Sequence, residues 1–172
     1  MLSWPYAHLI INHFPVVLSV AALAVTVLAL LLNRRGLWLT AMGALAGAGL
    51  FVYPVHFTGD KAGHAIRHSW FIQPGAIKSH GDAAAIAMYV ILLAGAFAAY
   101  SWWRSLKDPA GSIPVWMRAG VALGALAAVV TVTYTAYLGG KIIHDAPVLE
   151  LETAPVGLPP GIASPPRDST RN

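Results

Sequence analysis

Histidine is the residue type in this sequence best suited to chemistry. Imidazole is the commonest metal ligand in proteins and an axial ligand of haem iron. The chain has no Cys, which excludes disulfides, iron–sulfur clusters, thiolate zinc sites and covalently attached c-type haem. Its seven histidines are His8, His13, His56, His64, His68, His80 and His144. We expect a shared cofactor or metal site, with unrelated interfacial histidines as the alternative.

The spacing of the histidines limits what they can bind. His8 and His13 are five residues apart, about 140° around a helix, so they face different neighbours rather than chelating one ion. That geometry suits ligation of two haem edges better than chelation of one ion, with each imidazole directed toward a different neighbouring helix. His64 and His68 have the i, i+4 spacing that puts two ligands on one helical face. No Glu completes a hydrolytic zinc motif there.

The elements that must position these histidines are long apolar segments. Hydrophobic residues make up 57% of the 172 residues and charged residues 10%, whereas a soluble domain has about 25% charged residues. A helix needs about 20 apolar residues to cross a bilayer. Four segments are long enough, about residues 8–32, 37–57, 83–103 and 119–143. The sequence therefore predicts an all-α integral membrane protein, an up-down four-helix bundle within residues 1–144.

Two polar regions lie outside these spans. Residues 58–82 are predicted to form a loop, in which residues 63–70 could make a short surface helix. Six prolines and no helical period follow His144. This composition predicts an extended or disordered outer tail over residues 145–172.

The charges predict an orientation. No Lys or Arg precedes the first span, whereas Arg34 and Arg35 follow it at once. The positive-inside rule places that connection in the cytoplasm and both termini in the periplasm of a bacterial inner membrane. The histidines that flank the spans then lie about 28–39 Å from the cytoplasmic charges, at the outer boundary of the bilayer or beyond it. The net charge of +4 indicates lipid headgroups and loop topology, not nucleic acid.

Pro15 and two glycine pairs bear on helix geometry. If the first helix begins near Pro5, Pro15 kinks it; alternatively, the helix begins at Pro15 with His13 in the preceding turn. Glycines at GxxxG spacing predict close helix packing in the second and fourth spans. These pairs are Gly43 with Gly47 and Gly120 with Gly124.

Residues 8–15 read HLIINHFP. This stretch resembles the HPxxxHFP signature of a family of uncharacterised four-helix bacterial membrane proteins, with Leu9 in place of the usual Pro. The likeness extends to the number of spans, to His80 near the start of the third span and to Gly139-Gly140 closing the fourth. The resemblance implies the fold rather than a function. More loosely, histidines at four membrane helix ends are similar to those of membrane b-type cytochrome subunits.

These patterns favour a membrane-anchored b-type haem electron-transfer subunit rather than a stand-alone enzyme. We expect one or two haem b groups at the periplasmic helix ends. His13 and His80 are the predicted ligands of one haem, and His8 with His144 those of a second. Further candidate ligands are His56, His64 and His68.

The expected partners are the lipid bilayer and other redox components. Electrons would pass between a periplasmic partner, such as a cytochrome, and either quinone or a larger membrane complex. Two alternatives stay open. One is a cofactor-free structural subunit of a membrane complex, and the other is a copper- or zinc-binding membrane protein.

Overall fold

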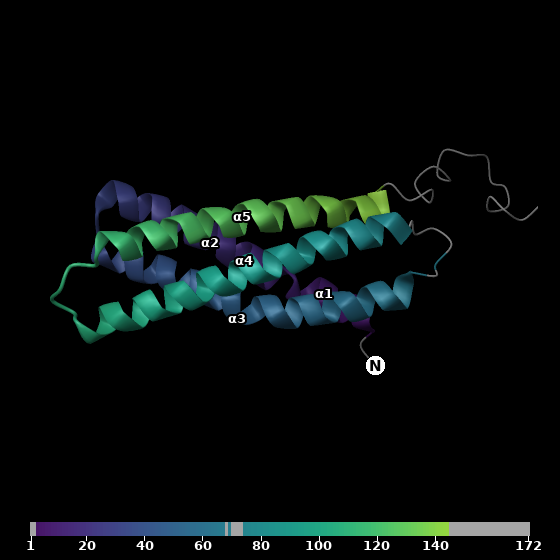
Figure 1. The fold of residues 1–172 in the computed structure, drawn as a ribbon, viewed down its shortest axis with the longest axis horizontal. Helices are drawn as coiled ribbons and strands as arrows, with labels where there is room; N and C mark the ends of the chain where they lie inside the picture. The colour runs from purple at the N-terminus through teal and green to yellow at the C-terminus, as the bar shows by residue number, and fades with distance from the viewer. Residues whose placement is uncertain (1–2, 68, 70–73, 145–172) are drawn as a thin grey trace, which may run out of the picture.

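The computed structural model describes residues 3–67, 69 and 74–144, drawn as coloured ribbon in Figure 1. These residues contain helices and no strand. The helices are α1 (Trp4–Ile11), α2 (His13–Leu32), α3 (Arg35–Ile66), α4 (Pro74–Lys107) and α5 (Val115–His144). The predicted all-α four-helix bundle is confirmed, with α1 and α2 together forming its first long member. The predicted outer tail lies outside the described residues.

Four helical stretches are long and apolar enough to cross a membrane. They are Trp4–Leu32, Arg35–Ile66, Gly75–Lys107 and Val115–Ile142. Each long helix packs against the next along the chain, and α5 also packs against α2, which closes the ring. Length and composition therefore indicate a multi-pass membrane protein.

Side-chain size is distributed as expected for helices in lipid. The interior is rich in fully buried Ala, such as Ala41 and Ala48. Large apolar side chains point outward, and Leu31 and Leu93 are 75% and 71% exposed. Lipid tails are as apolar as Leu, so helices gain more from close backbone approach than from burying large side chains.

Helices α3 and α4 approach each other closely at Gly49 and Gly95. A Cβ built on Gly95 would lie 2.7 Å from the Gly49 Cα, and one built on Gly49 would lie 2.9 Å from the Gly95 Cα. The GxxxG spacing did not identify this pair. Gly43 has nothing within 4 Å of such a Cβ, whereas one on Gly120 would collide with the Phe97 ring.

The first long helix is interrupted at Asn12. Helical structure begins at Trp4, which favours the first of the two starts considered for it, and α2 resumes at His13. Pro15 has no N–H to donate to the Ile11 carbonyl, so the regular ladder cannot continue across this point. Below the break α2 packs in the ring, while α1 packs mainly on α3.

The predicted polar loop at residues 58–82 is mostly helical instead. Helix α3 continues to Ile66 and α4 already begins at Pro74, so residues 63–66 form the last turn of α3 rather than a separate helix. Ala62 remains buried in the extension of α3. Counting apolar residues finds only the part of a helix that crosses the bilayer, and a polar helical extension beyond it is read as a loop.

We predict that Gly95→Ala destabilises the bundle. Overpacking a filled interface costs about 1–3 kcal/mol, which exceeds the roughly 0.5–1 kcal/mol that Ala gains over Gly in a helix. Thermal unfolding in detergent, followed by circular dichroism, measures the change. Gly43→Ala is the matched control and should unfold no earlier than wild type. Equal unfolding temperatures for the two variants would contradict the assigned contact.

Candidate functional site

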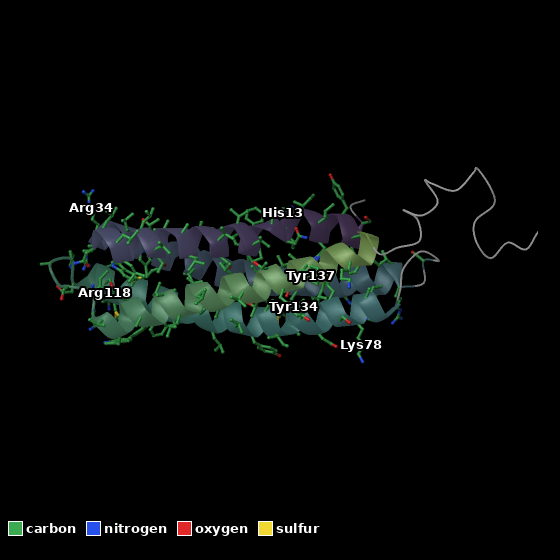
Figure 2. All side chains as sticks on the ribbon, turned by 90° about the horizontal axis from the view of Figure 1, so that it is seen from above. His13, Arg34, Lys78, Arg118, Tyr134 and Tyr137 are labelled. Atoms are coloured by element: carbon green, nitrogen blue, oxygen red, sulfur yellow. The ribbon has the colours of Figure 1, made fainter. Side chains whose placement is uncertain are left out.

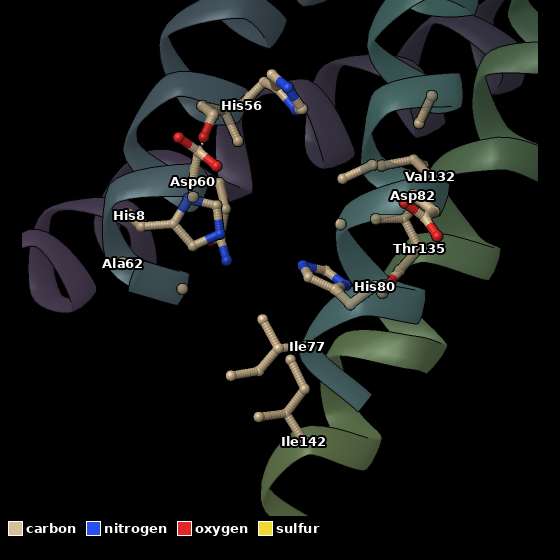
Figure 3. Close-up of a pocket in the computed structure, with 18 of the residues that line it drawn as sticks. His8, His56, Asp60, Ala62, Ile77, His80, Asp82, Val132, Thr135 and Ile142 are labelled. Atoms are coloured by element: carbon tan, nitrogen blue, oxygen red, sulfur yellow. Dashed lines mark hydrogen bonds between the residues drawn. The ribbon is translucent and has the colours of Figure 1, made fainter. Parts of the chain in front are cut away.

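A cavity of about 700 Å³ lies at the end of the bundle that carries the histidines. Residues of every helix line it, and Figure 3 shows its walls. Small-molecule and cofactor sites occupy about 300–1,000 Å³, so the cavity has the size of such a site. Its deep end is apolar, with Val52, Ala87, Ile91 and Val132.

Two imidazoles face this cavity from opposite walls. His8 comes from α1 and His80 from α4, and Figure 3 shows both rings pointing into the same space. Both side chains are partly buried. The fold therefore brings two histidines together that are 72 residues apart in the sequence.

Backbone carbonyls fix the orientation of both rings. The His8 Nδ1 lies 3.1 Å from the Val55 carbonyl oxygen and 3.3 Å from the Thr58 hydroxyl. The His80 Nδ1 lies 3.0 Å from the Thr135 carbonyl oxygen. A carbonyl only accepts hydrogen bonds, so each Nδ1 carries the proton and donates it. Each Nε2 then keeps its lone pair, and neither has a hydrogen-bond partner among the described residues.

A glycine lies beside each ring. A Cβ on Gly59 would lie 2.8 Å from the His8 Cε1, and one on Gly139 would lie 3.0 Å from the His80 Cε1. Each glycine comes four residues after the carbonyl that holds the ring. In an α-helix the carbonyl of residue i points toward residue i+4, so a side chain there would occupy the position of the imidazole. The contact of His8 with α3 and that of His80 with α5 therefore have the same construction, a carbonyl acceptor followed four residues later by a glycine.

The other histidines are placed differently. His56 also lines the cavity. His64 lines its rim, is 56% exposed and lies 3.7 Å from Asp60 on the same helix. His13, in contrast, is exposed and absent from the cavity lining (Figure 2). His68 and the His144 side chain lie outside the described part of the chain.

The structure therefore sets His8, not His13, opposite His80. His64 lies within ion-pair distance of Asp60, four residues before it on α3, and its predicted partner His68 lies outside the described residues. Within the described residues, no group of three or more His, Asp or Glu side chains is arranged to hold a metal ion.

Several residues of the site had no signal in the sequence analysis. Asn12 lines the cavity, and its buried Oδ1 has no hydrogen-bond partner in the described structure. Arg67 lies at the polar rim. The sequence does contain a glycine four residues after Val55. That glycine can be recognised as part of the site only when the helix that packs against it is known.

Comparison of the chain with protein-family models, with curated proteins and with solved structures finds no match. Fold and site define a class: a four-helix bundle with apolar spans and a cavity that presents two oriented imidazoles at one end.

We predict that the neutral rings of His8 and His80 carry their proton on Nδ1, because each donates to a carbonyl. Long-range proton–nitrogen correlation spectra of the ligand-free protein in detergent distinguish the two tautomers. The exposed His13 is the reference and should show the Nε2–H form of free imidazole. An Nε2–H form at His8 or His80 would contradict the assigned hydrogen bonds.

Proposed function

We propose that the protein is a membrane-anchored b-type haem electron-transfer subunit, with one haem b in the cavity and His8 and His80 as its axial ligands. One observation carries the proposal. Two imidazoles face each other across an apolar-walled cavity, each with its Nδ1 held by a carbonyl and its Nε2 free. Metal-binding histidines are oriented in this way, by a hydrogen bond from the second ring nitrogen.

The donor set fits haem better than a bare metal ion. The porphyrin supplies four of the iron ligands, so haem b needs only one or two axial side chains and an apolar slot between helices. A zinc site, by comparison, takes three or four protein ligands. Two converging imidazoles therefore favour haem over the copper or zinc alternative.

The ligand set also bears on the activity. A bound haem would supply a reversible one-electron couple, and His8 and His80 would hold its iron. The carbonyls of Val55 and Thr135 fix both rings, and apolar side chains line the deep end of the cavity. This favours electron relay over catalysis.

The proposal differs from the sequence prediction in its ligands. His13 and His80 were expected to share one haem, and His8 and His144 a second. Because His13 points away from the cavity, we assign one haem to His8 and His80. In the orientation predicted by the positive-inside rule, this site lies at the periplasmic surface. A periplasmic cytochrome, quinone or a larger complex would exchange electrons with it.

The polarity of the cavity favours one haem orientation. Apolar Ile91 and Val132 lie at its deep end, and Arg67 and Lys78 at its rim. The apolar edge of the porphyrin would lie deep, and the propionates would face the two cations.

We predict that His8→Ala and His80→Ala each abolish the reduced b-type absorption spectrum. A pyridine haemochrome assay should give one haem per wild-type chain. His13→Ala is the matched control and should keep the spectrum, since its ring lies outside the cavity. Gly139→Ala, which displaces the His80 ring, should lower haem content, whereas Gly75→Ala should not, because its Cβ meets nothing and the residue does not line the cavity.

A colourless wild-type protein from haem-replete cells would overturn the proposal. So would a spectrum that survives both His8→Ala and His80→Ala. Metal analysis of a colourless protein would then separate a copper or zinc site from a structural subunit.

We predict that Arg67→Gln and Lys78→Gln each weaken haem binding by up to about fivefold, the range of an exposed ion pair. Haem titration of the haem-free protein measures the dissociation constant. Lys61→Gln removes a cation of α3 that does not line the cavity and should leave the constant unchanged. Haem dimethyl ester lacks free propionates, so the variants should bind it as wild type does. Equal weakening by all three substitutions would contradict the orientation.

A further inference from the structure

The end of the bundle farthest from the cavity carries an excess of positive charge. Its cations are Arg34, Arg35, Arg104, Lys107 and Arg118. Figure 2 shows Arg34 and Arg118 together at this end. Asp108 is the one carboxylate there, and its Oδ1 accepts a hydrogen bond from the Gly111 N–H at 3.0 Å. In the described part of the chain, none of these five cations lies within salt-bridge distance of a carboxylate.

Neutral groups hold Arg35 in a fixed position. Its guanidinium donates to the carbonyls of Ser105 and Gly111, and to that of Asp108 at 3.0 Å. These carbonyls belong to the end of α4 and the turn after it, where a helix leaves its last carbonyls without intrahelical donors. The contacts stabilise the α4–α5 connection. They leave the positive charge of Arg35 without a counter-ion.

A small cavity lies beside this fixed guanidinium. It measures about 80 Å³, and its charged and polar side chains are those of Arg35, Arg104, Ser105, Asp108 and Ser112. A single water needs about 10–15 Å³ of such volume, so the cavity admits a group of several heavy atoms. Two guanidiniums against one carboxylate leave net positive charge and suit an oxyanion, because they offer donors in a forked geometry.

Arg118 adds an unsatisfied donor at the same end. Its Nη1 donates to the Asn33 side-chain oxygen at 3.2 Å, but its buried Nε has no hydrogen-bond partner among the described residues. Its chain neighbour Met117 lines the small cavity, whereas Arg118 itself does not. Arg118 therefore adds to the positive charge at this end without forming part of the cavity.

We propose that this end binds the phosphate of an anionic phospholipid, held between Arg35 and Arg104. The surroundings favour a lipid over free phosphate. Exposed Trp103 and Trp116 are chain neighbours of the lining residues Arg104 and Met117, and Trp is enriched where helices meet lipid headgroups. The Lys107 Nζ lies 4.0 Å from the centre of the Trp103 ring, which adds a cation at headgroup depth. Basic pockets between membrane helices are known to bind anionic headgroups.

Native mass spectrometry of the detergent-solubilised protein tests this proposal. Phosphatidylglycerol is titrated, and phosphatidylcholine serves as the zwitterionic reference. Wild type should bind one phosphatidylglycerol more tightly than phosphatidylcholine. Arg104→Gln should weaken that binding by about fivefold, the effect of one cation near a charged lipid surface. Arg35 is left unchanged because it also holds the α4–α5 connection.

Arg34→Gln is the matched control. It removes the same charge from the same end of the bundle, but Arg34 does not line the small cavity. It should weaken binding less than Arg104→Gln does. Equal losses would show an effect of net charge and overturn the site, as would a wild type without preference for phosphatidylglycerol. Displacement of the lipid by excess inorganic phosphate would overturn the lipid assignment in favour of free phosphate.

Discussion

Close packing of glycine against glycine is the contact on which the rest of the bundle depends. In lipid the hydrophobic effect does not drive helices together, so association relies on backbone approach and van der Waals contact. Helices α3 and α4 meet where the Cα atoms of Gly49 and Gly95 leave no room for a side chain. Figure 1 shows the two helices crossing near their middles and separating toward the end that holds the cavity. Because α3 and α4 diverge from this crossing, space for the cavity opens between their ends.

Within that space, the surroundings of His8 and of His80 have the same construction. His8 and His80 each donate Nδ1–H to a helix carbonyl, and a glycine four residues later leaves that carbonyl accessible. Such carbonyls are already bonded within their helix, yet each has a second lone pair to offer. The arrangement fixes which ring nitrogen faces the cavity. A pair of oriented Nε2 atoms is what the haem proposal rests on.

The two ends of the bundle carry different sets of charged residues. At the histidine end, imidazoles and a mixture of cations and carboxylates surround a large cavity. At the other end, the cations outnumber the carboxylates, and Arg35 is fixed by carbonyls that cannot neutralise it. Fixed charge of one sign at a bilayer surface attracts anionic headgroups. The same residues that predict orientation from the sequence are therefore placed to bind lipid as well.

The sequence by itself determined the helix class, the number of long helices and the end at which the histidines gather. Those features follow from local composition and length, which need no knowledge of neighbours. It did not predict the helical continuation of α3 to Ile66, because polar residues beyond the bilayer look like loop. Only the tertiary structure decided that His8 rather than His13 faces His80. Each residue turns a helix by about 100°, so the direction of a side chain depends on how the helix is rotated in the bundle, and packing such as that at Gly49 and Gly95 sets this rotation.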